Sequence, residues 1–390
     1  MSAGLFFAGC AFVKEKPVLE IDAPDHLVQL VSEEIPLLED DLDIASLCKA
    51  IERSLEYYNR LPEDRIFRLG KDTYRTAEMK ASLIAFRDIF STTSDNRRLT
   101  ERLREQFNLY QCLGRNGEGS VLYTGYYEPV LEGSRSRTPE FPYPIYRRPD
   151  DHVVIDLGTF HSKYKGERLI ARVDDGRIVP YYTRRDIDVG GKLEGKGLEI
   201  AWLSDPVDIF FLHIQGSGTI RFDDRSLIQV SYAQSNGRAY RSLGRHLVEQ
   251  GKMSIGEISL DGIKRYLRYH PDEMFDLLAH NESYVFFRVV EEGPRGSLDV
   301  PVTAGRSIAT DPAFFPQGAL ALIKVKKPVI EEKGEIHSWI PFTRFVLNQD
   351  AGGAIKGPGR VDLFCGTGAR AGIVAGHLKE YGELYFLMKK

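Results

Sequence analysis

The sequence predicts a mainly β protein with helices, an α+β chain divided into two domains. Its 390 residues exceed a single domain at roughly 150 residues each. Apolar residues recur at helical spacing in the first hundred residues, whereas short runs of β-forming residues fill most of the later chain. The composition, 42% hydrophobic and 28% charged, is typical of folded soluble proteins and excludes general disorder.

Helices are expected in the first third of the chain. Three sets of apolar residues recur there at every third or fourth position, which is the spacing of one helix face. They carry no visible chemistry, so we interpret them as core-facing scaffold. The sets are Ile44, Leu47, Cys48, Ile51, Leu55 and Tyr58; Met79, Leu83, Phe86 and Phe90; and Leu99, Leu103 and Phe107.

Short strands are expected from Tyr123 onwards. Apolar runs separated by Gly, Pro and Asp predict a barrel or sandwich. Helices are expected at 240–248, at 263–267 and after Pro271, a residue favoured at the first helical position. The strand candidates are 123–130, 153–157, 169–173, 178–182, 198–203, 209–214 and 227–232.

A second β region is expected from residue 284 to the end. Glycine concentrates between its later strands, which predicts positive φ angles and close backbone approach in a compact barrel or a substrate groove. The order of helices, strands, helices and strands predicts that one domain is inserted into another. The strand candidates are 284–290, 307–309, 319–325, 339–348, 359–365 and 384–388.

Charge and missing motifs exclude several classes of protein. The net charge of −4 is unlike that of a nucleic-acid binder. Gly366, Gly368 and Gly372 lack dinucleotide-binding spacing, and too few residues follow them for the required βαβ unit. The sequence has no P-loop, no nucleophile elbow and no zinc-protease helix. Its cysteines have neither metal nor redox spacing, and no metal or cofactor is expected.

Two aspartates, Asp350 and Asp362, flank a glycine-rich segment. If 360–364 is a strand, Asp362 shares a face with Arg360, and the alternate residues face the other side. Aspartate is uncommon inside strands, so Asp362 is expected to point at a partner, either Arg360 in a salt bridge or a substrate. The context of Asp350, beside Ala-Gly-Gly, is typical of a turn residue that accepts hydrogen bonds from backbone amides. A catalytic role for Asp350 is the alternative.

Further motifs precede these aspartates. They are YTGYYEP at 123–129, HIQGSG at 213–218, NGRAYRSLG at 236–244, and Asp311 ahead of Pro316-Gln317-Gly318. Together with the aspartate pair, the motifs resemble those of the membrane-bound lytic murein transglycosylase A family, with its C-terminal three-aspartate domain. The resemblance covers residues 121–390.

The resemblance implies a fold with two domains. Residues 21–125 and 285–390 would form a helical segment and a double-psi β-barrel domain, which carries the catalytic residues. Residues 126–284 would form an inserted second β-barrel domain with helices, and a glycan groove would lie between the two. Residues 1–20 would be a lipoprotein signal or a tail.

The resemblance also implies a reaction on peptidoglycan. The β-1,4 bond between N-acetylmuramic acid and N-acetylglucosamine would be cleaved without water, leaving 1,6-anhydromuramoyl ends. One carboxyl group is enough, because the C6 hydroxyl of the sugar replaces the usual second group and attacks intramolecularly. Asp362 matches the catalytic acid that then acts as base, and Asp350 matches the other cleft aspartate. A non-catalytic peptidoglycan-binding protein or a murein hydrolase are the alternatives.

An acid must be protonated near neutral pH, whereas free aspartate titrates near 3.9. Burial beside Phe364 or repulsion from Asp350 would raise the pKa of Asp362, and Arg360 would lower it. We therefore expect Arg360 to turn away.

The resemblance places substrate-binding residues in the groove. Lys356 is expected to meet a carboxylate of the peptide stem or to be a solvated turn lysine, and the tyrosines would line the groove or pack in the core. The set is Thr124, Tyr126, Tyr127, Gln215, Gly216, Ser217, Asp311 and Lys356.

The segment Leu5-Phe6-Phe7-Ala8-Gly9-Cys10 places Ala-Gly-Cys after large apolar residues, which resembles the lipobox of a lipoprotein signal. The alternative is that Cys10 is an unmodified cysteine of the N-terminal tail. With the family resemblance, a lipidated Cys10 predicts an outer-membrane lipoprotein facing the periplasm. We expect a monomer that binds glycan strands and other cell-wall enzymes.

Overall fold

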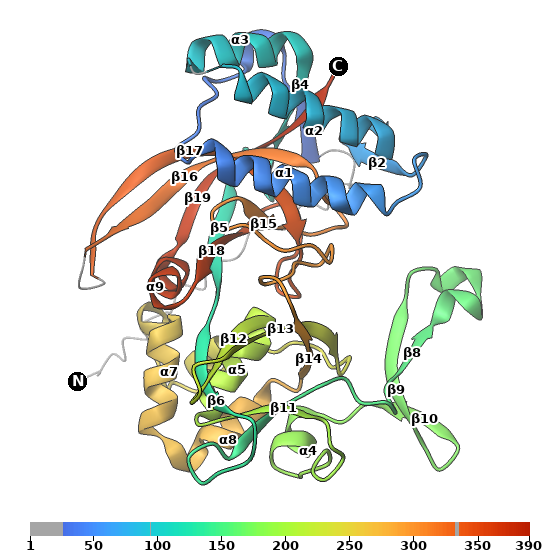
Figure 1. Cartoon of the computed structure of the whole chain (residues 1–390), viewed down its shortest axis with the longest axis vertical. Helices are drawn as coiled ribbons and strands as arrows, with labels where there is room; N and C mark the ends of the chain where they lie inside the picture. The colour runs from blue at the N-terminus through green and yellow to red at the C-terminus, as the bar shows by residue number, and fades with distance from the viewer. Residues whose placement is uncertain (1–25, 94, 332–334) are drawn as a thin grey trace, which may run out of the picture.

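The computed structural model describes residues 26–93, 95–331 and 335–390. The predicted signal segment 1–20, with Cys10, lies outside these residues. The described chain forms two bodies stacked along the long axis of the molecule (Figure 1). We call them the barrel body, which contains both ends of the described chain, and the insert body, which is made from the middle.

The barrel body is built on an eight-stranded sheet, in which six strands close into a barrel. The strand order is β1-β4-β19-β16-β17-β15-β18-β5, and β19 also pairs with β5, which closes the ring. The strands are β1 (Leu27–Gln29), β4 (Phe107–Cys112), β5 (Val121–Glu128), β15 (Ser307–Ala309), β16 (Leu320–Ile330), β17 (Ile336–Asp350), β18 (Arg360–Thr367) and β19 (Lys379–Lys389).

Helices cover the top of this barrel. The three predicted apolar stripes are confirmed in α1 (Ile44–Asn59), α2 (Thr76–Ser91) and α3 (Asn96–Gln106). Asp43 caps α1 by accepting a hydrogen bond from the Ser46 amide. Phe86 of α2 packs against Phe345 of the barrel, with ring centroids 4.8 Å apart. Between α1 and α2 lies a hairpin that the helical patterns did not predict, β2 (Ile66–Leu69) and β3 (Asp72–Arg75).

The insert body contains a six-stranded sheet in the order β14-β13-β12-β6-β11-β7. A bridge between Arg147 and Phe287 links the two ends of this order. A separate sheet, β10-β9-β8, projects as an arm (Figure 1). The strands are β6 (Val130–Ser134), β7 (Tyr143–Tyr146), β8 (Val153–Asp156), β9 (Arg168–Asp174), β10 (Arg177–Pro180), β11 (Glu199–Leu203), β12 (Ser217–Phe222), β13 (Leu227–Ser235) and β14 (Val285–Val290).

The helices of the insert body are α4 (Arg184–Asp188), α5 (Pro206–Gln215), α6 (Leu243–Glu249), α7 (Leu260–Tyr269) and α8 (Pro271–His280). The last three confirm the helices predicted after residue 240. The strand predicted at 209–214 is wrong, because these residues form α5. Asp205 caps this helix and Pro206 occupies its first turn. Its residues are buried on nearly every side, so it lacks the polar face that reveals a helix in a sequence.

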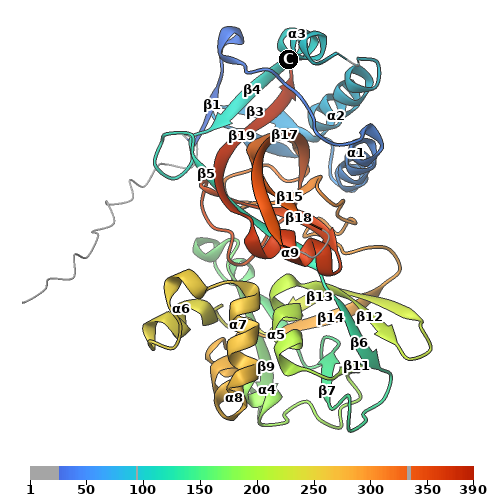
Figure 2. The same ribbon diagram turned by 90° about the vertical axis from the view of Figure 1, so that its left-hand side faces the viewer.

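A last helix, α9 (Ala369–His377), lies where the two bodies meet, next to β5 (Figure 2). The mixed α+β class with a closed barrel is therefore confirmed, and the double-psi topology stays a prediction. The short strands β1 and β4 were not predicted. Phe107, assigned to a helical stripe, begins β4 and is fully buried.

Gly125 allows α9 to lie directly on β5. A Cβ at this position would lie 2.7 Å from the Ala375 Cα atom and 2.9 Å from the Cys365 sulfur. We expect Gly125→Ala to lower the free energy of unfolding by about 1–3 kcal/mol, because the packed backbone cannot move away. Urea unfolding measures this, with Gly256→Ala as control, since a Cβ there meets nothing within 4 Å. Equal losses in both variants would contradict the prediction.

Candidate active site

Both aspartates lie in one row across four neighbouring barrel strands. Asp362 of β18 is aligned with Thr124 of β5 on one side and with Ala309 of β15 on the other. Ala309 is in turn aligned with Asp350, the last residue of β17. Residues at one level of adjacent strands share a face of the sheet. Strand register therefore brings the two carboxyl groups into one site.

Asp362 is held in a partly buried position on its strand, with 17% of its side chain exposed to the cavity. The Thr124 hydroxyl donates a hydrogen bond to its Oδ1 atom. Val361 and Leu363, its neighbours along the strand, point into the hydrophobic core as the alternation predicted. Burial raises the pKa of the Asp362 carboxyl to about 6, Arg360 opposes this rise, and the charge of Asp350 adds to it.

The expectation that Arg360 turns away from Asp362 is wrong. Its Nη2 atom lies 3.9 Å from the Asp362 Oδ1 atom. Its Nη1 atom donates a hydrogen bond of 3.2 Å to the Ala354 carbonyl, which draws part of the guanidinium towards the loop. At this separation the desolvation of Asp362 outweighs the attraction to Arg360, so the pKa of the acid stays raised.

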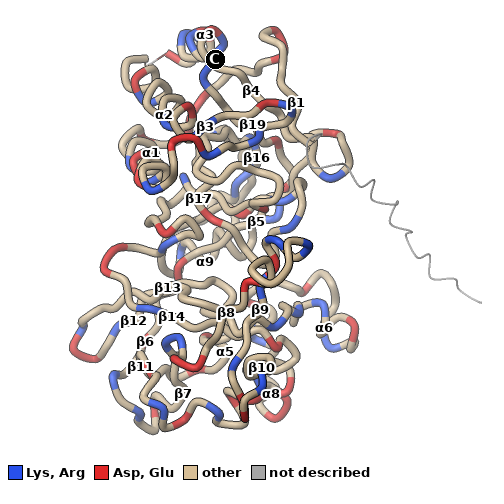
Figure 3. Tube along the Cα trace, turned by 90° about the vertical axis from the view of Figure 1, so that its right-hand side faces the viewer, with Lys and Arg blue, Asp and Glu red and all other residues tan. Residues whose placement is uncertain are grey.

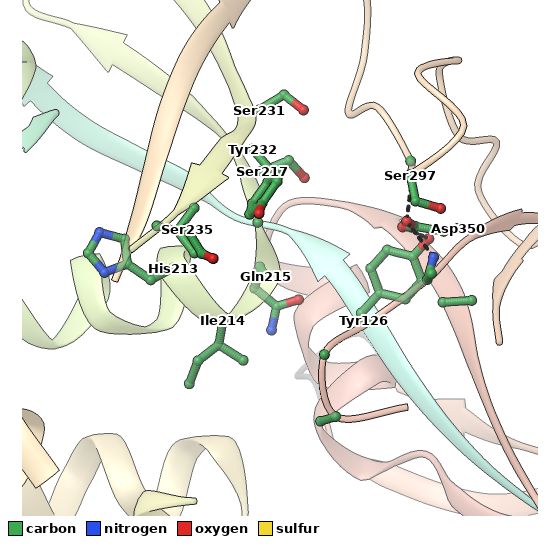
Figure 4. Close-up of a pocket in the computed structure, with 18 of the residues that line it drawn as sticks. Tyr126, His213, Ile214, Gln215, Ser217, Ser231, Tyr232, Ser235, Ser297 and Asp350 are labelled. Atoms are coloured by element: carbon green, nitrogen blue, oxygen red, sulfur yellow. Dashed lines mark hydrogen bonds between the residues drawn. The ribbon is translucent and has the colours of Figure 1, made fainter. Parts of the chain in front are cut away.

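Asp350 is fixed by three hydrogen bonds (Figure 4). Its Oδ1 atom accepts from the Ser297 and Ala351 amides, each at 2.8 Å. Its Oδ2 atom accepts from the Tyr126 hydroxyl at 2.9 Å. Burial raises the pKa of Asp350, and these three donors oppose the rise because they favour the ionised form. Asp350 is thus both bonded to backbone amides and part of the site, the two alternatives that its sequence context left open.

The raised pKa of Asp362 predicts a pH-dependent cost in stability. The folded protein binds the Asp362 proton more tightly than the unfolded chain does, because the folded pKa is about 6 against 3.8 when unperturbed. This proton contributes fully to stability below pH 3.8, and the contribution is lost as the pH rises through 6. Asp362→Asn cannot ionise, so at pH 7.5 we expect it to be up to about 3 kcal/mol more stable than the wild type. Urea unfolding at pH 4 should show almost no difference. A gain of equal size at both pH values would contradict the prediction.

A cavity of about 850 Å³ lies between the two bodies and includes both aspartates. This is the size of pockets that bind small ligands or several sugar units. Figure 4 shows Gln215, Ser217 and Tyr232 on the insert side, facing Tyr126 and Asp350 on the barrel side. Of the residues predicted from the sequence, those that line the cavity are Tyr126, Gln215, Gly216, Ser217, Asp350 and Asp362.

Four predicted substrate-binding residues do not line this cavity. Thr124 lies behind Asp362 and bonds to it. The Tyr127 ring packs on α9 so closely that a Cβ added at Gly372 would lie 3.0 Å from it. Tyr127 therefore belongs to the packed interior. Asp311 is buried, and its carboxylate accepts from the Gly357 amide at 2.8 Å and from a second amide within its own turn. Asp311 therefore ties down the loop after Asp350.

Lys356 is exposed on that same loop and outside the cavity, so the structure favours a solvated turn lysine. Sequence reasoning missed Ser297, whose amide binds Asp350. The sequence marks this position only by the turn-forming proline and glycine of Pro294-Arg295-Gly296, which precede it.

Within the described ranges no three His, Cys, Asp or Glu side chains are grouped to hold a metal ion. No described helix is long and apolar enough to cross a membrane.

A partly buried carboxyl pair in a cleft between two bodies, with the pKa of Asp362 raised to about 6, defines an enzyme of the acid–base class. Comparisons with known proteins identify which kind of enzyme this is. Residues 122–288 match the MltA specific insert domain, and residues 306–388 match the 3D domain.

The chain is 33% identical over 291 residues to the membrane-bound lytic murein transglycosylase A of Escherichia coli K12, covering 73% of this chain and 71% of the relative. It is 32% identical over 280 residues to that of Vibrio cholerae, covering 71% and 68%. The chain belongs to the membrane-bound lytic murein transglycosylase A family, and it is a lytic transglycosylase.

Solved structures agree with this assignment. The membrane-bound lytic murein transglycosylase of Agrobacterium tumefaciens superposes with a TM-score of 0.74 at 29% identity, covering 93% of this chain and 97% of that one. The E. coli MltA with bound chitohexaose superposes with a TM-score of 0.71 at 26% identity, covering 94% of each chain.

Proposed function

We propose that this enzyme cleaves the glycan strand of peptidoglycan between N-acetylmuramic acid and N-acetylglucosamine, and leaves 1,6-anhydromuramoyl ends. One observation carries the proposal: Asp362, in the cleft between the bodies, has a pKa raised to about 6. A carboxyl group with this pKa is partly protonated near neutral pH and can act as a general acid. The names of the relatives, which contain the word murein, and the chitohexaose complex of one of them support the glycan substrate.

Asp362 performs both proton transfers in the proposed reaction. It first donates its proton to the glycosidic oxygen, and the bond from that oxygen to C1 of the muramoyl sugar breaks. Asp362, now a carboxylate, then takes the proton of the C6 hydroxyl while the C6 oxygen forms a new bond to C1. The carboxyl returns to its starting form and no water is consumed. The attack is intramolecular, which avoids the entropic cost of recruiting a second reactant.

Asp350 provides a fixed negative charge in this proposal. Its three hydrogen-bond donors hold it in place and favour its ionised form. That charge helps keep Asp362 protonated before the reaction and stabilises the positive charge that develops on the sugar ring in the transition state. Tyr126, Gln215, Gly216 and Ser217 then bind the sugars, because hydroxyl, amide and aromatic groups complement both the polar edges and the apolar faces of a sugar ring. Thr124, bonded to Asp362, acts as a positioning residue.

Digestion of purified murein sacculi tests the function. Product masses with anhydro ends support the lytic reaction, because each such fragment lacks one water molecule relative to the corresponding reducing-end product. Reducing ends alone would identify a murein hydrolase. Binding to sacculi without any release of fragments would identify a non-catalytic binding protein.

The location and the domain limits are part of the proposal. The membrane-bound relatives support a place in the cell envelope, and we propose the periplasmic side of the outer membrane with a lipid on Cys10. Mass analysis of the protein expressed from its native locus tests the lipid, and an unmodified Cys10 in a soluble product would overturn it. We propose a catalytic domain at 21–125 with 285–390 and an insert at 126–284. Two strands depart from these limits: β14 (Val285–Val290) pairs within the insert sheet, and β5 (Val121–Glu128) runs across the first boundary.

A further inference from the structure

The cavity between the bodies contains one arginine that forms no direct ion pair with a described carboxylate, although Asp186 lies within reach of its charge. Four arginines line it, together with Asp299, Asp350 and Asp362. Arg238 is the one that forms no ion pair within the described ranges. The other three have carboxylate partners: Arg184 with Asp188, and Arg288 and Arg295 with Asp299. Charged residues of both signs are otherwise interspersed over the molecule (Figure 3).

Arg238 is held rigidly before any ligand binds. Its Nε and Nη2 atoms donate to the Tyr181 carbonyl at 3.0 and 2.8 Å. The preceding Asn236 is fully buried and donates to the carbonyls of Tyr182 and Glu282. Gly237 between them has a φ of +73°, and a Cβ there would lie 2.4 Å from the Ile170 side chain. The turn therefore presents a guanidinium that loses little entropy on binding.

This turn reaches across the cleft towards the carboxyl pair. Tyr240, two residues after Arg238, also lines the cavity. Burial raises the pKa of the Tyr240 hydroxyl, and the positive charge of Arg360 on the barrel side opposes that rise. Arg238, Tyr240 and Asp362 line the same cavity, so a ligand that reaches the proposed acid can also reach the Arg238 turn.

The insert side of the same cavity also contains a histidine whose ring nitrogens have no hydrogen-bond partner within the described ranges. This residue, His213, lines the cavity and is 6% exposed. Buried polar groups are nearly always hydrogen-bonded. The His213 ring packs against Tyr284 and Phe287, with ring centroids 4.3 and 5.5 Å away, and lies on the side away from Asp350 (Figure 4). His213 is therefore part of the wall behind the cavity, and the proposed ligand contact rests on Arg238.

We propose that Arg238 binds a carboxylate on the lactyl side arm of the muramoyl sugar, either the lactyl carboxylate itself or one on the attached peptide. This inference rests on the proposed function. The sugar rings of the glycan are neutral, so the side arm is the part of the substrate that an unpaired cation recognises. Guanidinium and carboxylate groups match in geometry as well as in charge. Without such a cation, Asp350 and Asp362 would repel the side arm.

The test measures binding separately from catalysis. Each variant is made in the Asp362→Asn background and titrated with three soluble oligosaccharides of equal length: a peptide-bearing muramoyl glycan, the same glycan after amidase removal of its peptides, and a chitooligosaccharide. Arg238→Gln is expected to raise the Kd for a carboxylate-bearing ligand about tenfold, the effect of losing one charge-assisted hydrogen bond at a partly exposed site. The Kd for the chitooligosaccharide should not change.

Two further variants keep the result interpretable. Arg238→Lys retains the charge and should recover most of the affinity. Arg241→Gln is the matched control, because Arg241 pairs with Glu282 at 2.9 Å and does not line the cavity. Arg241→Gln should bind all three ligands like the parent protein.

The pattern of losses identifies the carboxylate. A loss confined to the peptide-bearing glycan assigns the carboxylate to the peptide, because the lactyl carboxyl of that glycan is held in the amide bond. A loss confined to the stripped glycan assigns it to the lactyl carboxylate that the amidase frees, and a loss on both shows that Arg238 accepts either group. Equal losses on all three ligands, or no loss on any, would overturn the proposal. Failure of the proposed reaction would instead appear in the product masses from wild-type enzyme, which this titration does not use.

Discussion

Asp362→Asn is expected to lower the rate of fragment release from sacculi about a thousandfold, because the amide can neither donate the proton to the glycosidic oxygen nor remove one from the C6 hydroxyl. General acid–base groups commonly contribute about 10²- to 10⁴-fold, and here one group performs both transfers. The rate is measured from the soluble anhydro fragments released per unit time. Sedimentation with sacculi should show that the variant still binds.

A surface carboxylate provides the comparison for this variant. Asp174 pairs with Arg172 on the exposed arm at 2.9 Å and does not line the cavity, and Asp174→Asn should keep full activity. Substantial release of anhydro fragments by Asp362→Asn would show that another group supplies the proton, and Asp350 would then be the first residue to examine.

Asp350→Asn is expected to lower the rate at pH 7 about 10- to 100-fold and to change the pH profile. The amide oxygen can keep the bonds from the Ser297 and Ala351 amides, while its NH₂ group faces the Tyr126 hydroxyl, which can accept. The substitution therefore removes the charge and preserves the geometry. Without that charge Asp362 loses its repulsive neighbour, and its pKa falls.

The pH profile shows this shift directly. Wild-type kcat/KM should fall as the pH rises through about 6, the pKa of Asp362, because only the protonated carboxyl can donate. In Asp350→Asn this fall should begin at a lower pH. Tyr126→Phe is the matched comparison, since it removes one hydrogen bond and leaves the charge, and its profile should stay close to the wild type. An unchanged profile in Asp350→Asn would show that Asp350 does not influence the acid.

Much of the barrel and both aspartates were predictable from local patterns. Alternation around Asp362 placed Val361 in the core and the carboxyl on the opposite face, because successive residues of a strand point to opposite sides. The apolar stripes of α1, α2 and α3 were readable because each of these helices has one buried face and one solvated face. The motifs resembling a known family then pointed to the reaction.

Helix α5 shows where local patterns stop being informative. Its apolar residues are buried against both the sheet and the other helices of the insert body, so no polar face interrupts the run, and a short apolar run fits a strand equally well. Asp205 and Pro206, a cap and a first-turn proline, were the signals that favoured a helix.

The sequence by itself determined which residue types were present to perform the chemistry, and which face of its strand Asp362 would occupy. Only the tertiary structure decided their neighbours. Residues far apart in the chain, such as Thr124 and Asp362, become adjacent through strand register, and register depends on long-range pairing that no local pattern encodes. The same packing made Asp311 a structural tether, left Lys356 outside the cavity and brought Arg238 into it.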